Sequence, residues 1–145
     1  MKYVVLPLLC VVAIVLTACG GGNSTTNSSQ LSGNWSATLT DGKGSTIVGF
    51  NVTFTEGSST VVGVANMTFT TTSSCLAVIM SPPTAALGTG NSFQMNILSG
   101  TTNLNGSNQM TLQGTPSSTT INGTWNLSGS GMGCTDNDVF TMFKM

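Results

Sequence analysis

From residue 31 onward, apolar and polar side chains alternate in short runs that are separated by turns rich in Gly, Ser and Asp. Successive side chains of a β-strand point to opposite faces, so this alternation predicts strands with one buried face. Turn residues recur about every ten positions, which is typical of an all-β sandwich or barrel. The predicted strands cover residues 33–40, 46–55, 60–70, 92–98, 108–113, 119–127 and 138–145.

The apolar positions of each run define the predicted core. They are Trp35, Ala37 and Leu39; Val48, Phe50, Val52 and Phe54; Val61, Gly63, Ala65, Met67 and Phe69; Phe93, Met95 and Ile97; Met110 and Leu112; and Ile121, Gly123, Trp125 and Leu127. The run from Cys75 to Met80 is continuously apolar and is stopped by Pro82 and Pro83. This run is either a further strand at a sheet edge or a buried connection.

These runs give seven or eight antiparallel strands and leave no segment with a helical period of 3.6 residues. We therefore expect residues 31–145 to form one all-β domain, an antiparallel eight-stranded meander barrel or a closely related sandwich. The last strand could pair with the first, which would close the barrel and remove both sheet edges.

The N-terminus does not share this pattern. Lys2 precedes an apolar run from Val4 to Leu16, which is shorter than the roughly 20 residues that a membrane-spanning helix needs. This arrangement predicts an export signal at residues 1–18 that is removed. Residues 20–30 have no apolar side chain to bury, so residues 19–30 are expected to form a flexible tether.

The junction Leu16-Thr17-Ala18-Cys19 resembles the lipobox of bacterial lipoproteins. The resemblance implies cleavage before Cys19, acyl chains on Cys19 and an exported protein held to a membrane by that lipid. Gly20, where an Asp would retain such a protein in the inner membrane of enteric bacteria, favours the outer membrane. The alternative is an ordinary secretory signal with a chance cysteine.

The remaining cysteines predict a disulfide. Cys10 leaves with the signal and Cys19 carries lipid, so Cys75 and Cys134 are the free pair in an oxidising compartment. A bond between them would close a loop of about 60 residues and stabilise the fold by roughly 4 kcal/mol. The alternative is two separate thiols.

Few charged residues remain after cleavage. Lys43 and Lys144 against four carboxylates give a side-chain charge of 2 − 4 = −2, and the chain has no His. A phosphate-neutralising patch, a Ser–His hydrolase site and a zinc or iron site all lack their residues, so we expect no nucleic-acid partner, no enzyme activity, no metal and no cofactor. Asp136-Asn137-Asp138 is either a solvated turn or part of a Ca²⁺ site.

Leu31-Ser32-Gly33-Asn34-Trp35 resembles the Gly-x-Trp entry of the calycin group, the lipocalins and avidins, in which the Trp plugs the closed end of a barrel. Ile121 to Trp125 repeats the order. The glycines could let the indoles pack in a filled core. Alternatively, Trp35, Phe50, Phe93 and Trp125 line a pocket for an apolar ligand. We therefore expect an envelope lipoprotein with a structural or interaction role and an envelope protein as its candidate partner. The alternative is a calycin-like carrier of a small apolar ligand.

Overall fold

The structure, a computed structural model, describes residues 26–145 except 42, 59, 102–105 and 130–133. The predicted signal peptide, Cys19 and residues 20–25 lie outside the described residues. Within the described part of the chain, no helix has the length and apolar character needed to cross a bilayer.

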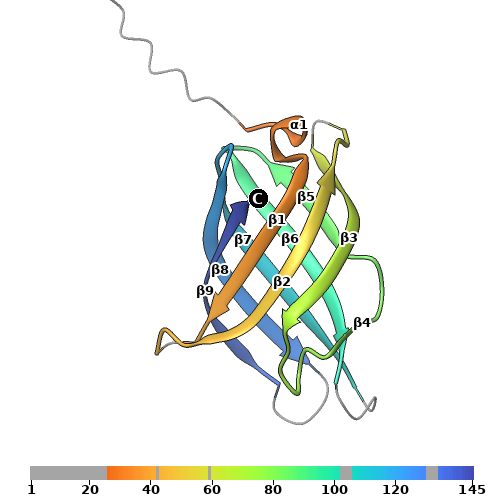
Figure 1. Cartoon of the computed structure of the whole chain (residues 1–145), viewed down its shortest axis with the longest axis vertical. Coiled ribbons are helices and arrows are strands. Elements are labelled where there is room, and N and C mark those ends of the chain that lie inside the picture. Colours follow the sequence, from red (N-terminus) through yellow and green to blue (C-terminus); the bar gives the residue numbers. More distant parts are fainter. Residues whose placement is uncertain (1–25, 42, 59, 102–105, 130–133) are drawn as a thin grey trace, which may run out of the picture.

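Eight antiparallel strands close into a barrel, and a ninth short strand pairs at its side (Figure 1). The barrel closes because β1 pairs with β2 on one side and with the last strand, β9, on the other. This confirms the all-β prediction and selects the barrel over the sandwich. The strands are β1 (Gly33–Thr40), β2 (Thr46–Thr55), β3 (Val61–Thr71), β4 (Val78–Ile79), β5 (Thr84–Gly88), β6 (Ser92–Gly100), β7 (Ser107–Pro116), β8 (Thr120–Gly129) and β9 (Asp136–Lys144).

The predicted inward faces of β1, β2, β6, β7 and β8 are confirmed, because their large apolar side chains are all buried in one continuous core. Phe140 and Met142 of β9 join them. The alternation of each strand follows directly from pleating, since one face meets the interior and the other meets solvent.

The prediction for β3 was wrong in its first half. Val61 is 53% exposed and Val62 is 2% exposed, so the phase there is the opposite of the predicted one. Val64 pairs with Phe54 and Asn66 pairs with Thr53, which leaves Ala65 as an extra residue. Such a β-bulge inverts the alternation, and only the part after it, with Met67 and Phe69 partly buried, follows the predicted phase.

The eighth barrel strand, β5, was not predicted. It is five residues long and buries the small Ala85 beside Leu87, so its alternation is a weak signal. The run from Cys75 to Met80 contains both a buried connection and an edge strand, the two alternatives considered for it. Leu76 is a fully buried connection, and Val78–Ile79 is an edge strand that pairs with β6.

The barrel wall is split between β3 and the chain that carries β4 and β5. β3 pairs with β5 only at Val61–Ala86 and Val62–Ala85. Continuing that register would place Pro83 opposite Val64, and a proline has no backbone N–H for the ladder. The edge of β3 from Gly63 to Thr71 therefore has no strand partner among the described residues, and Figure 1 shows the β4–β5 connection bulging away from it.

The folded domain begins earlier than the composition indicates. A one-turn helix, α1 (Ser28–Leu31), starts at a capping box in which the Asn27 side chain accepts from the backbone N–H of Gln30. The backbone N–H of Thr26 donates to Asn91 Oδ1 at 2.8 Å. Residues 26–30, predicted as the end of the tether, are thus fixed to the barrel by polar contacts that no apolar pattern could indicate.

Candidate functional site

One end of the barrel, called here the tether end, is where α1 lies (Figure 1). Trp35 is fully buried, and its indole Nε1 donates a hydrogen bond to the carbonyl of Leu31 at 2.6 Å. The Nζ of Lys144 lies 5.9 Å from the centre of the Trp35 ring and donates to the Gln30 carbonyl at 2.9 Å. Leu31 is itself fully buried, so the chain's own residues cover this opening.

The four side chains predicted to line a pocket are members of the packed core. Phe54 lies between two of them, with its ring centre 6.1 Å from that of Trp35 and 5.8 Å from that of Phe93. Such tilted and edge-to-face contacts are the favoured packing of aromatic rings. Phe50 and Trp125 are equally buried, and the Trp125 Nε1 is satisfied by the Thr40 carbonyl at 3.0 Å.

The glycines of the two Gly-x-Trp motifs leave space for neighbouring atoms that do not belong to the indoles. A Cβ on Gly33 would lie 3.0 Å from Lys144 Cε, so this glycine makes room for the lysine that crosses the tether end. A Cβ on Gly123 would lie 2.0 Å from the Gln113 carbonyl oxygen, so this glycine permits close approach of the β7 backbone. The nearest atoms at these two positions belong to Lys144 and to the β7 backbone, whereas the expected neighbour was an indole.

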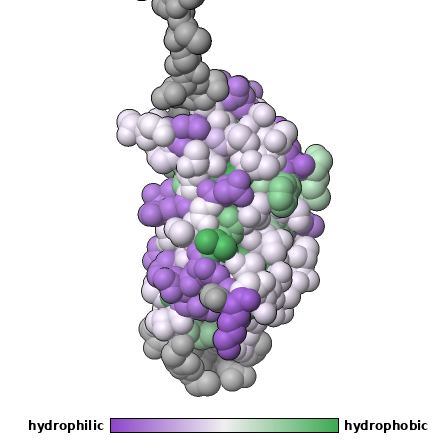
Figure 2. Space-filling model, turned by 90° about the vertical axis from the view of Figure 1, so that its left-hand side faces the viewer, coloured by the Kyte–Doolittle hydropathy of each residue, from purple (hydrophilic) through white to green (hydrophobic). Residues whose placement is uncertain are grey.

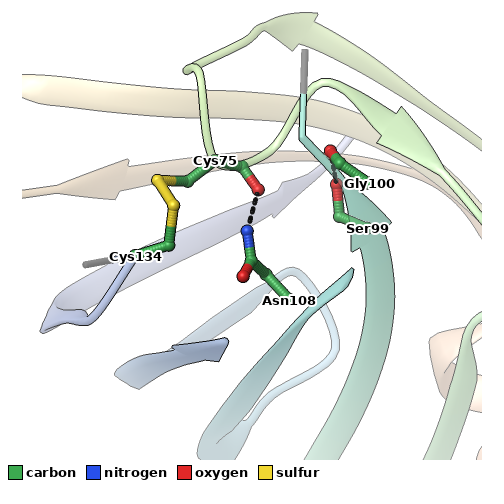
Figure 3. Close-up of a disulfide and its surroundings, with 5 residues drawn as sticks. All are labelled: Cys75, Ser99, Gly100, Asn108 and Cys134. Atoms are coloured by element: carbon green, nitrogen blue, oxygen red, sulfur yellow. Dashed lines mark hydrogen bonds between the residues drawn. A yellow bond between two sulfur atoms is a disulfide. The ribbon is translucent and has the colours of Figure 1, made fainter. Parts of the chain in front are cut away.

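The opposite end, called here the far end, is closed around a disulfide (Figure 3). Cys75 and Cys134 are bonded, with their Cα atoms 5.7 Å apart, which confirms the predicted pair. Leu76, the next residue after Cys75, is fully buried. A tight turn joins Ser73 and Leu76 by two backbone hydrogen bonds, so the disulfide holds a compact plug over this opening.

A buried asparagine ties that plug to the barrel wall. Asn108 is fully buried, and its Nδ2 donates to the Cys75 carbonyl at 2.8 Å (Figure 3). Its Oδ1 has no hydrogen-bond partner among the described residues, and a Cβ on Gly129 would lie 1.5 Å from that oxygen. Asn108 was not among the predicted site residues, although its place two residues before Met110 puts it on the inward face of β7.

The acidic triplet lies inside a strand. Asp136 to Asp138 begin β9, two residues before the predicted start, and not in a solvated turn. Asp138 Oδ2 accepts from Thr40 Oγ1 at 3.3 Å, and Asp136 Oδ1 accepts from the backbone N–H of Asn137 at 2.8 Å. Within the described residues, no three His, Cys, Asp or Glu side chains gather as a metal site would require. No further carboxylate of the described residues therefore joins Asp136 and Asp138 to support the Ca²⁺ alternative.

The outer face of the barrel is built mainly from neutral hydroxyl and amide side chains. Cross-strand pairs bond to one another, as when Thr53 Oγ1 donates to Asn34 Oδ1 at 2.8 Å and Thr111 Oγ1 donates to Asn96 Oδ1 at 3.0 Å. Apolar patches interrupt this polar surface on the side that carries β8 and β9 (Figure 2). Val139 is 53% exposed there.

Comparison of the chain with protein-family models, with curated proteins and with solved structures finds no match.

Proposed function

We propose that this chain is an exported lipoprotein, held by lipid on Cys19 to a bacterial membrane, the outer membrane being favoured, with a structural or interaction role in the cell envelope. The lipid anchor rests on the lipobox resemblance at Cys19. The observation that supports the structural or interaction role is the barrel. Its interior is occupied by the chain's own aromatic and aliphatic side chains, and both ends are covered, by α1 and by the disulfide-bonded plug. In the part of the chain that the structure describes, such a scaffold presents its outer surface to other molecules, and its interior is occupied.

Two features of that surface suit an interaction role. The first is the β3 edge from Gly63 to Thr71, whose sequence carries no charge. Unpaired strand edges pair readily with another chain, and natural edges are usually blocked by charged residues. The second is the neutral outer face, which can donate and accept hydrogen bonds without attracting highly charged partners. Neither feature requires a catalytic group or a cofactor.

The carrier hypothesis would need a cavity among Trp35, Phe50, Phe93 and Trp125. These side chains are all buried in the core, and the two indole N–H groups already have backbone partners. A ligand could enter only by displacing packed rings, at a cost of several kcal/mol for each large side chain that loses its contacts. The packing therefore supports the scaffold interpretation over the carrier.

The anchor is tested by metabolic labelling with a palmitate analogue in a bacterial host. We expect the full chain to incorporate the label and to sediment with membranes, and we expect Cys19→Ser to abolish both. Cys10→Ser is the matched control, since Cys10 belongs to the predicted signal and should leave labelling unchanged. Incorporation that persists in Cys19→Ser would refute the proposal.

A further inference from the structure

The described residues place two exposed apolar side chains at the end of the barrel from which the tether leaves. Phe143 is 56% exposed near the end of β9, and Met145, two residues on, is 69% exposed. The backbone N–H of Met145 donates to the Asn34 carbonyl at the start of β1. The backbone of both residues therefore lies beside the first part of β1, which directly follows α1.

The length of the tether limits how far this end can stand from a membrane. Thr26 lies seven positions after Cys19, with six residues between them. At most about 3.5 Å per position, this segment reaches roughly 25 Å when fully extended. Thr26 is fixed to the tether end, because its N–H bonds to Asn91 and its Oγ1 donates to the Pro116 carbonyl. A lipid on Cys19 would hold this end, and not the far end, beside the bilayer.

The two ends of the barrel also differ in the charge of their side chains. Three of the four carboxylate side chains, those of Asp41, Asp136 and Asp138, follow the end of β1 or begin β9, which is the far end. Lys43 also lies at the far end, so the side-chain charge there is 1 − 3 = −2, whereas Lys144 and Glu56 at the tether end sum to 1 − 1 = 0. Membrane surfaces with anionic lipids repel carboxylates and attract lysines, so they favour this orientation.

We propose that the tether end is a membrane-docking surface, in which Phe143 and Met145 enter the lipid interface while Lys144 faces the headgroups. This inference rests on the lipid anchor of the proposed function. Exposed aromatic and thioether side chains gain free energy on entering the interfacial region, and a tether that confines them there raises their effective concentration. Docking gives the barrel a fixed orientation and turns the far end and the strand walls toward the envelope space.

The chain contains its own pair of probes for this orientation. Met145 at the tether end is 69% exposed, and Met80, whose backbone N–H bonds to the Leu98 carbonyl near the far end of β6, is 56% exposed. Peroxide converts an accessible methionine to its sulfoxide, which peptide mass spectrometry quantifies. In solution, the two similar exposures predict similar oxidation rates for the Cys19→Ser chain.

The test uses the lipidated protein on vesicles of phosphatidylethanolamine with a minority of phosphatidylglycerol. We expect Met145 to be oxidised several-fold more slowly than Met80, and Phe143→Ser to reduce this difference. Val78→Ser is the matched control, since Val78 is 50% exposed in β4 and should leave the difference intact. Both substitutions replace exposed side chains, and a cooperative unfolding transition verifies the fold of each variant.

Two results would overturn the inference, and they are distinguishable. If the protein sediments with the vesicles but Met145 is oxidised at least as fast as Met80, the anchor stands and docking is wrong. If the protein does not sediment with the vesicles, both the anchor and the docking surface fail.

Discussion

Removing the Cys75–Cys134 bond should lower the free energy of unfolding by about 4 kcal/mol. The two cysteines are 59 residues apart, and the bond closes that segment into a loop in the unfolded chain. In the chain-entropy treatment, a loop of this length loses about 14 cal/mol/K of conformational entropy, which corresponds to roughly 4.2 kcal/mol at 25 °C. The double variant Cys75→Ser/Cys134→Ser regains that entropy when it unfolds.

The same free energy predicts a large change in melting temperature. The segment from residue 26 to residue 145 has 120 residues. At about 2.1 cal/mol/K per residue, its unfolding entropy is roughly 0.25 kcal/mol/K, so a loss of 4 kcal/mol should lower the Tm by about 15 °C. The buried Leu76 and the bond from Asn108 to the Cys75 carbonyl remain in the variant, and they should keep its plug in place below the transition.

The assay is thermal unfolding followed by Trp emission, on the oxidised protein, the reduced protein and the double Ser variant. We expect the reduced protein and the variant to melt at similar temperatures, well below the oxidised protein. A reducing agent added to the variant is the control and should change nothing. The reasoning is refuted if the oxidised protein and the variant share one Tm, or if alkylation without reduction labels Cys75 and Cys134.

Two further substitutions test the closures at the two ends. Gly129→Ala should lower the free energy of unfolding by about 2–3 kcal/mol, because the new methyl group would displace the buried Asn108 amide and break its hydrogen bond. Gly100→Ala is the control. Its Cβ would lie 3.5 Å from the nearest atom, so the free energy of unfolding should fall by less than about 0.5 kcal/mol. Urea titration measures both, and equal midpoints would show that Asn108 is not held as described. Leu31→Ala should cost about 3 kcal/mol by leaving a cavity beneath α1, against less than about 1 kcal/mol for the exposed Thr38→Ala. A Leu31→Ala midpoint close to that of Thr38→Ala would mean that α1 does not cover the core.

The alternation of side chains was sufficient to predict most of the barrel. β2 shows why, since four large apolar residues at a strict period of two allow a single assignment of faces. The same rule failed at β3, because Val61, Val62 and Val64 are apolar in both phases and the bulge at Ala65 has no signature of its own. A single extra residue was enough to exchange the two faces.

The remaining errors involve residues whose role depends on distant partners. β5 is a strand because β6 pairs with it along its length, while its own five residues give almost no signal. α1 is held by bonds to Gly57 and Lys144 and by the burial of Leu31 in the core, all of which involve residues far from it in sequence. The disulfide was predictable because counting cysteines needs no geometry. The role of Asn108 beside it was not, since its partners are a carbonyl 33 residues away and a glycine across the ladder.

The central claim is that the described side chains fill the barrel interior, from which we propose that the protein acts through its anchor and outer surface. Trp35 and Trp125 report on the interior from its two halves. The most direct measurement is the Trp emission of the chain from residue 19 with Cys19→Ser, free of detergent, titrated with a brominated fatty acid that quenches indoles on contact. The account predicts emission unchanged by the titration. Saturable quenching that leaves the unfolding transition cooperative would contradict it and would establish a ligand cavity.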